Sequence, residues 1–194
     1  AARRLRRQPL SIFSAILVTI LILTAIFGPL LAPYDPNAID MANRFAPPSL
    51  EHPFGTDDFG RDILSRVMVG ARVSLMVGLI AVGLSATVGS LLGLVAGYTG
   101  RITDEIIMRA MDILFAFPAI LLAIAIMAAL GRGVGNAMIA IGIVYIPIFA
   151  RIARGSVLSI REEEFVDAAL ATGSSNSRIL FRHIFPNVLS PLIV

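Results

Sequence analysis

The chain has 194 residues, of which 57% are hydrophobic and 15% are charged, and its mean hydropathy is +0.85. Soluble domains have about 45–50% apolar and about 25% charged residues, so this composition excludes an ordinary soluble domain and indicates an integral membrane protein. The net charge is +3, but all 16 basic residues are arginine and many flank apolar runs, as topology signals do; we expect no nucleic-acid partner. With no cysteine and two widely separated histidines, the sequence predicts no disulfide framework and no metal site.

The first predicted element comprises an arginine-rich N-terminus and a first transmembrane helix, residues 1–34. The basic run RRLRR precedes a window without charged residues, 8–34. A transmembrane helix needs about 20 mostly apolar residues, whereas the apolar core of a secretory signal has only about 7–15. The window therefore predicts a start-anchor helix.

Residues 35–72 are too polar to span a membrane and form the second predicted element. Apolar residues at helical spacing predict an amphipathic helix over 58–72 that lies at the membrane interface and leads into the second span. We expect Thr56 or Asp57 to cap this helix and Asp62 to pair with Arg66. A contact with another protein is expected to use four charged residues: Asp57, Asp58, Arg61 and Asp62. The acids lack the spacing of a calcium loop, and no catalytic motif accompanies them, so neither a metal site nor a catalytic site is predicted.

Three further windows without charged residues, 73–100, 113–131 and 133–150, predict three more spans. In the first of them small residues recur at every fourth position and predict close contact with another helix, in this chain or in a partner: Ser85, Gly89, Gly93 and Gly97. Pro118 and Pro147 are expected to kink the other two spans. Buried helices of a large soluble enzyme, the alternative, would not account for four such windows.

The distribution of arginine predicts the orientation of the chain. With the N-terminus in the cytoplasm, eleven arginines lie in cytoplasmic segments and five lie outside: Arg44, Arg61, Arg66, Arg72 and Arg132. This agrees with the positive-inside rule. Residues 35–72 are then periplasmic or extracytoplasmic, and the polar stretch after residue 150 is cytoplasmic.

That polar stretch, EEEFVDAALATGSSNSRILFRHIFPN, covers residues 162–187. Acidic residues favour a helix start at Glu162, an apolar stripe follows, and Gly173 ends the helix. Four polar residues then form a turn, a second helix covers 178–185, and Pro186 begins a fifth span that is cut off at the end of the sequence. Because a simple connection between bundle helices takes about 2–8 residues, this much longer stretch predicts a docking element for another protein.

The same stretch resembles the EAA loop of ABC importer permeases. The resemblance rests on Asp167-Ala168-Ala169, then Gly173, then Pro186, and the segments 52–75 and 181–187 are similar to the C-type subunit of dipeptide, oligopeptide and nickel permeases. It covers nearly the whole chain. Asp167 stands where the motif usually has Glu, and His183 and Phe185 also depart from the general pattern.

The resemblance implies an all-α polytopic bundle of the type I importer kind: four full transmembrane helices, the start of a fifth, and six in the complete protein. Residues 73–194 would be the permease core, with the coupling loop at 155–186. The loop would seat on an ATPase subunit through seven residues: Phe165, Asp167, Ala168, Ala169, Leu170, Gly173 and Pro186.

The function implied is that of one half of a heterodimeric importer for short peptides in a bacterial inner membrane. Its expected partners are a B-type permease, two ATP-binding subunits that hold ATP and magnesium, an external solute-binding protein, the peptide and the lipid bilayer. The chain has no G-x-x-x-x-G-K-[ST] motif, so we expect no enzymatic activity and no bound cofactor. Three alternatives remain open: import of nickel or another small solute, a secondary carrier, and a membrane-anchored scaffold. A carrier usually needs ionisable residues deep in its spans, which the windows lack.

Overall fold

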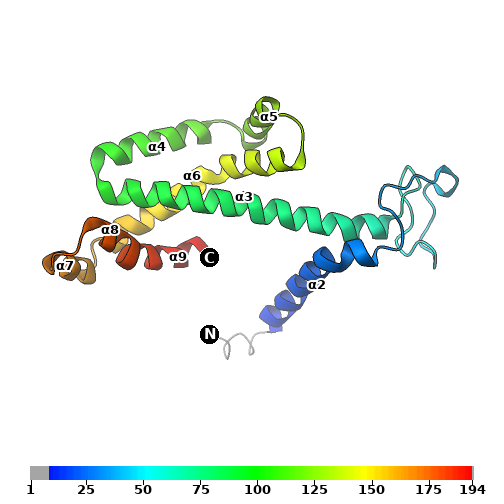
Figure 1. Cartoon of the computed structure of the whole chain (residues 1–194), viewed down its shortest axis with the longest axis horizontal. Helices are drawn as coiled ribbons and strands as arrows, with labels where there is room; N and C mark the ends of the chain where they lie inside the picture. Colours follow the sequence, from blue (N-terminus) through cyan, green and yellow to red (C-terminus); the bar gives the residue numbers. More distant parts are fainter. Residues whose placement is uncertain (1–8, 194) are drawn as a thin grey trace. The chain divides into compact units, whose positions relative to one another are not determined.

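The computed structural model describes residues 9–193; the basic run that was predicted to be cytoplasmic, within residues 1–8, lies outside the described residues, as does Val194. Between residues 9 and 193 the chain forms helices and no β-strand, and its one isolated β-bridge joins Thr56 to Asp62. The all-α fold class is confirmed. The chain divides into two compact units, Ala1–Met76 and Val77–Val194. The boundary falls inside helix α3 (Ile63–Thr99), which is labelled in Figure 1.

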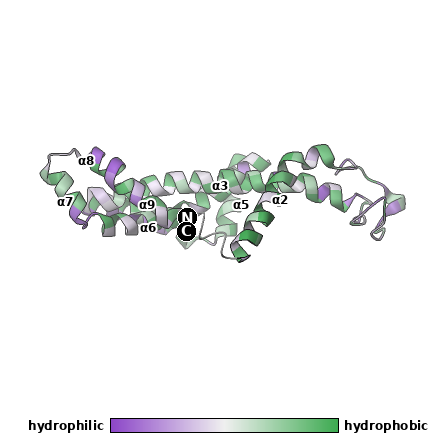
Figure 2. Ribbon diagram, turned by 90° about the horizontal axis from the view of Figure 1, so that it is seen from below, coloured by the Kyte–Doolittle hydropathy of each residue, from purple (hydrophilic) through white to green (hydrophobic). Residues whose placement is uncertain are grey.

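The first unit contains α2 (Pro9–Leu31), the loop that follows it with a 3-10 turn η1 (Met41–Asn43), and the start of α3. Helix α2 is almost uniformly apolar (Figure 2), and only 6% of its most apolar window is buried. A helix that is apolar on all sides and exposed is suited to a lipid environment. Gly28 lets α2 approach α3 closely, because a β-carbon there would lie 2.5 Å from the carbonyl oxygen of Met68.

Within the described residues, three helices are long and apolar enough to cross a membrane: α2, α3 and α6 (Val134–Ile160). A fourth span is formed only if α4 (Arg101–Ala116) and α5 (Ala119–Leu130) are counted together, and these two helices meet at 96°. The kink predicted at Pro118 in the third span, 113–131, is therefore confirmed, and it takes the form of a break between two helices. Pro118 accounts for the break, since it has no N–H and holds Phe117 in an extended conformation with ψ of 138°. Pro147, in contrast, lies inside α6, which continues through it.

Helix α6 is the centre of the second unit and contacts α4, α5 and α9 (Phe185–Ile193). It also packs against α3 along the small residues identified in the sequence. A β-carbon at Gly89 would lie 2.6 Å from the carbonyl oxygen of Ile146, and one at Gly97 would lie 2.8 Å from Cβ of Val157. Ser85, in the same row, is fully buried and donates its hydroxyl to the carbonyl oxygen of Ala81. The row of small residues on α3 thus lets the backbones of α3 and α6 approach each other closely.

Two apolar clusters surround α6. One lies between α3, α4 and α6 and contains Met111, Ile146 and Ala150. The other joins the ends of α3 and α6 to α7 (Glu164–Ala171), to the π-helical turn η2 (Ile179–Ile184) and to α9; its members are Leu94, Ala153, Val157, Val166, Ala169, Ile179, Leu180, Ile184 and Val188. The polar stretch is therefore anchored on the membrane helices by a shared core.

The predicted interfacial helix over 58–72 differs in two ways from the structure. Residues 58–62 are not helical, because Gly60 adopts a positive φ of 72° and the Thr56–Asp62 bridge closes a tight turn. From Ile63 onward the helix runs without a break into the apolar part of α3. The amphipathic turns are thus the beginning of α3 and not a separate element.

Candidate functional site

Helix α7 follows directly from the end of α6. The chain turns at Arg161, whose N–H donates to the carbonyl oxygen of Val157 at 2.9 Å and whose guanidinium reaches the carbonyl oxygen of Gly97 at 3.3 Å. Arg161 also pairs with Glu162 at 3.0 Å. The entry to α7 is therefore tied to the ends of both α3 and α6.

Acidic residues crowd the start of α7, as expected for a helix N-terminus. Glu163 occupies the N-cap position without a side-chain capping bond, and Glu164 and Asp167 lie in the first turn. All three carboxylates are exposed. The predicted helix start at Glu162 is two residues early, because Glu162 and Glu163 belong to the turn that ends α6.

Gly173 ends α7. Its φ is +76°, its N–H donates to the carbonyl oxygen of Leu170, and Ser174 N–H donates to the carbonyl oxygen of Ala169. These bonds satisfy carbonyl groups that the helix end would otherwise leave unpaired. Nothing lies within 4 Å of a β-carbon built at Gly173, so glycine is required by backbone conformation and not by space.

The two faces of α7 differ in exposure. Val166 and Ala169 are 2% and 8% exposed and contribute to the shared core, whereas Phe165 and Leu170 are 42% and 50% exposed. Ala168 lies on the exposed side as well. Of the residues expected to form the docking surface, Ala169 therefore packs inward, and its role is to seat the helix.

After the turn, the chain forms one helical run and not two elements separated at Pro186. Ser175 caps it by accepting from Arg178 N–H at 3.4 Å, and α8 (Asn176–Arg178), η2 and α9 then follow without a gap. Pro186 has no N–H to donate, and the preceding turn widens: Phe185 N–H donates to the carbonyl oxygen of Leu180, five residues back. Pro186 is exposed as the second residue of α9.

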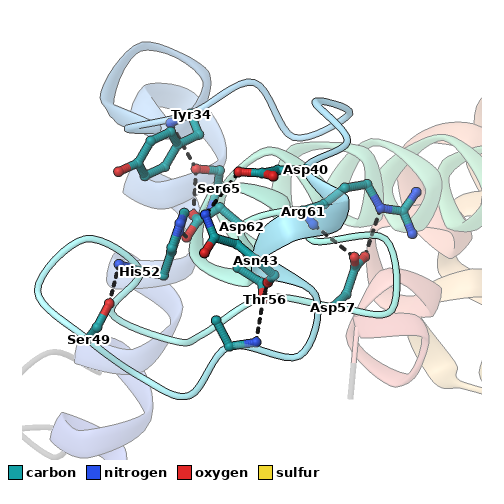
Figure 3. A network of polar contacts seen from close by, with 11 residues as sticks. Tyr34, Asp40, Asn43, Ser49, His52, Thr56, Asp57, Arg61, Asp62 and Ser65 are labelled. Carbon is teal, nitrogen blue, oxygen red and sulfur yellow. Dashed lines mark hydrogen bonds and ion pairs between the residues drawn. The ribbon is translucent and has the colours of Figure 1, made fainter.

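Of the four charged residues that were expected to contact another protein, three lie in a network of polar contacts in the loop between α2 and α3 (Figure 3): Asp57, Arg61 and Asp62. The Asp57 carboxylate accepts from the N–H groups of Phe59 and Arg61, pairs with the Arg61 guanidinium at 2.8 Å and pairs with Arg66 at 2.9 Å. Burial raises the pKa of Asp57, but these hydrogen bonds and the Arg61 charge outweigh it and lower the pKa. The sequence predicted that Arg66 would pair with Asp62, and this was wrong. Arg66 pairs with Asp57 because the turn at Gly60 brings Asp57 beside the helix.

Asp62 is the residue that caps α3. It is 3% exposed and accepts from both the N–H and the hydroxyl of Ser65 at 2.7 Å and from Nδ1 of His52 at 3.0 Å. Burial raises its pKa, and the Ser65 and His52 contacts reverse this, so the pKa lies below the ordinary value of 3.8. The caps expected from the sequence, Thr56 and Asp57, stabilise the turn instead: Thr56 is buried and accepts from Ala46 N–H.

Asp58 is the most exposed carboxylate of these charged residues, with 54% of its side chain accessible, whereas Arg61 has 23% and also lies over the Phe59 ring. Asp57 and Asp62 are thus committed to the internal structure of the loop. The contacts that were not foreseen include those of His52 with Asp62 and of Asp104 on α4 with Arg154 on α6. Helix α4 itself could have been found from its sequence, because Ile107, Met111 and Leu114 repeat at helical spacing and pack into one cluster.

The described part of the chain contains no group of three or more His, Cys, Asp or Glu residues arranged to hold a metal ion. Its buried side-chain polar atoms all have hydrogen-bond partners. The loop encloses an open pocket of about 390 Å³ between Tyr34, Asp40 and His52. Helix α7 combines exposed apolar side chains, Phe165 and Leu170, with an inward face that is seated in the shared core.

Comparison with known proteins agrees with this architecture. Residues 89–194 match the family described as the binding-protein-dependent transport system inner membrane component, and residues 1–48 match the N-terminal transmembrane domain of oligopeptide transport permease C. The chain is 53% identical over 194 residues to the dipeptide transport system permease protein DppC of Alkalihalophilus pseudofirmus, covering 100% of this chain and 64% of that relative.

Two further relatives have similar coverage. The probable D,D-dipeptide transport system permease protein DdpC of Escherichia coli is 46% identical over 190 residues, which are 98% of this chain and 64% of that protein. The glutathione transport system permease protein GsiD of Escherichia coli is 49% identical over 193 residues, which are 99% of this chain and 64% of that protein. The chain thus spans slightly less than two thirds of the length of these relatives. With the family match over residues 89–194 and the helical membrane architecture, the chain belongs to the family of inner membrane components of binding-protein-dependent transport systems.

Proposed function

We propose that this chain forms the greater part of a permease subunit of an ATP-driven importer of short peptides. The three relatives described above are named for a dipeptide, a D,D-dipeptide and glutathione, all of which are small peptides. None of these names favours nickel, the alternative cargo that the sequence left open. A second, B-type permease subunit would complete the pathway.

The observation that carries the proposal is the exposed face of α7. Phe165 and Leu170 present apolar surface next to the carboxylate of Asp167, while Val166 and Ala169 hold the helix on the core that includes the end of α6. Exposed apolar side chains on a well-anchored helix, rimmed by charge, are typical of a protein interface. The partner is an ATP-binding subunit, and the docking residues are Phe165, Asp167, Ala168 and Leu170.

In this proposal the chain does not hydrolyse ATP. ATP and magnesium bind to the partner subunits, and closure of these subunits displaces α7 and with it the membrane helices. ATP can drive such a change only if it binds one state of the transporter more tightly than the other. The N-terminus, α7 and the start of α9 are cytoplasmic, and the loop between α2 and α3 lies outside, where Asp58 and Arg61 contact a solute-binding protein.

The test uses the full-length protein assembled with its partner subunits in proteoliposomes. Ala168→Trp adds bulk to the exposed face of α7, and Gly173→Val places a β-branched residue at φ of +76°. Both variants should insert into the membrane but lose copurification with the ATP-binding subunit and ATP-driven peptide uptake. Asn37→Trp, an equally bulky change at an exposed position of the loop after α2, serves as the control. Normal uptake by the Ala168→Trp variant would refute the docking assignment.

A further inference from the structure

Two ion pairs join α4 to α6. Asp104 forms a bidentate ion pair with Arg154, in which Oδ1 lies 2.5 Å from Nε and Oδ2 lies 2.5 Å from Nη2. Asp112 contacts Nη2 of Arg151 at 2.7 Å. The first pair is the more shielded of the two, with side-chain exposures of 34% for Arg154 and 20% for Asp104. When a carboxylate accepts two parallel hydrogen bonds from one guanidinium, the relative orientation of the two groups is fixed as well as favourable in energy.

Arg154 lies in a part of α6 that packs closely against α3. A β-carbon at Gly93 of α3 would lie 2.7 Å from Cβ of Ala153 and 2.9 Å from the backbone nitrogen of Arg154, so the two helix backbones are in close contact there. Ala153 and Val157 are fully buried in the cluster that also contains the inward face of α7. The last turns of α6 and the helix α7 therefore share one core and are expected to move together.

The apolar contact between α4 and α6 has a different character. It includes Ile107, Met111 and Leu114 of α4, packed against Ile146 and Ala150 of α6. Burial of apolar surface is non-directional, so a bidentate ion pair adds a directional constraint on the register of α4 and α6 that burial alone does not supply. A bidentate ion pair resists sliding, because displacement along the helix axis breaks one or both of its hydrogen bonds.

We propose that the Asp104–Arg154 pair is a positioning link that transmits the displacement of α7 through α6 to α4 and the bend at Pro118. The inference rests on the proposed function, since it assumes that a partner subunit moves α7. Asp104 contacts neither the partner nor the peptide. It acts by keeping α4 in register with α6, so that ATP hydrolysis and peptide movement remain coupled.

The test is the ratio of ATP hydrolysed to peptide taken up by the complete transporter in proteoliposomes. Asp104→Asn keeps the size of the side chain but removes its charge. We expect this variant to bind the ATP-binding subunit and hydrolyse ATP within about twofold of the unsubstituted protein, while uptake per ATP falls by about tenfold, within the range typical of coupling between sites. Glu105→Gln is the matched control, because Glu105 is on the same helix in an exposed pair with Arg109, and its ratio should not change.

A second pair of variants separates a mechanical link from a general structural role. Residues 1–194 contain no cysteine, so in a transporter whose other cysteines have been replaced, Asp104→Cys combined with Arg154→Cys can be joined selectively by a short bifunctional thiol reagent. The unlinked protein should be uncoupled, and cross-linking should restore most of the uptake per ATP. Arg154→Lys, which keeps the charge but loses the two-pronged geometry, should give an intermediate ratio and provides the measurement if Asp104→Asn does not fold.

The link would be overturned by an unchanged ratio in both the Asp104→Asn and Arg154→Lys variants, or by a failure of the cross-link to restore coupling. Loss of subunit binding in Asp104→Asn, in parallel with loss of uptake, would also contradict it, because a positioning residue leaves docking intact. If these results are obtained while the unsubstituted transporter still takes up peptide in an ATP-driven manner, the link is refuted and the proposed function is not. Absence of ATP-driven peptide uptake in the unsubstituted transporter refutes the proposed function, and the link with it.

Discussion

Replacement of Gly89 by alanine should destabilise the protein, whereas the same change at Gly83, which is also in α3, should not. Gly89 faces α6, and a β-carbon there would lie 2.6 Å from the carbonyl oxygen of Ile146 and 2.7 Å from Cβ of Phe149. The first of these atoms is backbone, so rotation of a side chain cannot relieve the clash. Gly83, on the same helix, has nothing within 4 Å of a β-carbon and provides the matched control.

The magnitude follows from two opposing effects. Alanine is favoured over glycine in a helix interior by roughly 0.5–1 kcal/mol, and this gain applies to both positions. Overpacking of a close contact costs about 1–3 kcal/mol, and this cost applies only at Gly89. The free energies of unfolding of Gly89→Ala and Gly83→Ala should therefore differ by about 1–3 kcal/mol, with Gly83→Ala equal to or more stable than the unsubstituted protein.

The assay is equilibrium unfolding in mixed micelles, followed by far-ultraviolet circular dichroism and repeated by thermal melting. Because the two variants share the same helix, the same substitution and the same detergent, differences in the unfolded state largely cancel. If the two unfolding free energies agreed to within about 0.3 kcal/mol, well below the smallest overpacking cost, the close α3–α6 contact would be refuted.

Three further predictions concern the loop and the broken span. Replacing Asp62 with alanine removes the cap of α3 and the partner of His52. The loop over residues 35–62 should then become sensitive to protease, and the free energy of unfolding should fall by about 1–2 kcal/mol. In the control variant Asp58→Ala, the free energy of unfolding should stay within about 0.5 kcal/mol of that of the unsubstituted protein. The pKa of Asp62 in the folded state lies below 3.8, so its stabilising contribution is present above pH 3.8 and is lost as the pH falls through the folded-state pKa. The loop should therefore lose protease resistance below about pH 4, and unchanged resistance there would contradict this reasoning. Pro118→Ala restores an N–H and removes the restriction of Phe117 to an extended conformation. The distances between spin labels on α4 and α5 should then be longer and more broadly distributed than in the unsubstituted protein. An unchanged narrow distribution would show that packing alone sets the 96° bend.

Much of the fold was predictable because it depends on local chemistry. The charge-free windows determine where helices can lie in a membrane, and the row of small residues from Ser85 to Gly97 determines which face of α3 can approach another backbone. Gly173 ends α7 and Pro118 breaks a span for reasons that belong to single residues. The resemblance on residues 162–187 correctly indicated the permease family to which the chain belongs.

The candidate site was only partly predictable. Spacing identified α7 as apolar on one side, but it could not decide whether Ala169 or Phe165 faces the rest of the chain. That choice depends on the position of the cluster around Val157 and Ile184, which lies on other helices. The roles of Asp57 and Asp62 were assigned wrongly for a similar reason, since the turn at Gly60 exchanges their partners.

By itself, the sequence determined that this protein is a helical membrane protein of the permease family, with a polar helix–turn–helix stretch between apolar segments and a small-residue face on α3. The tertiary structure alone decided which helix meets that face, which side of α7 remains exposed, and that Asp104 and Arg154, 50 residues apart, form a two-pronged ion pair. The physical reason is that helix formation, capping and breaking depend on residues within one or two turns. Pairing between helices depends on the geometry of elements far apart in the chain, and no local pattern encodes it.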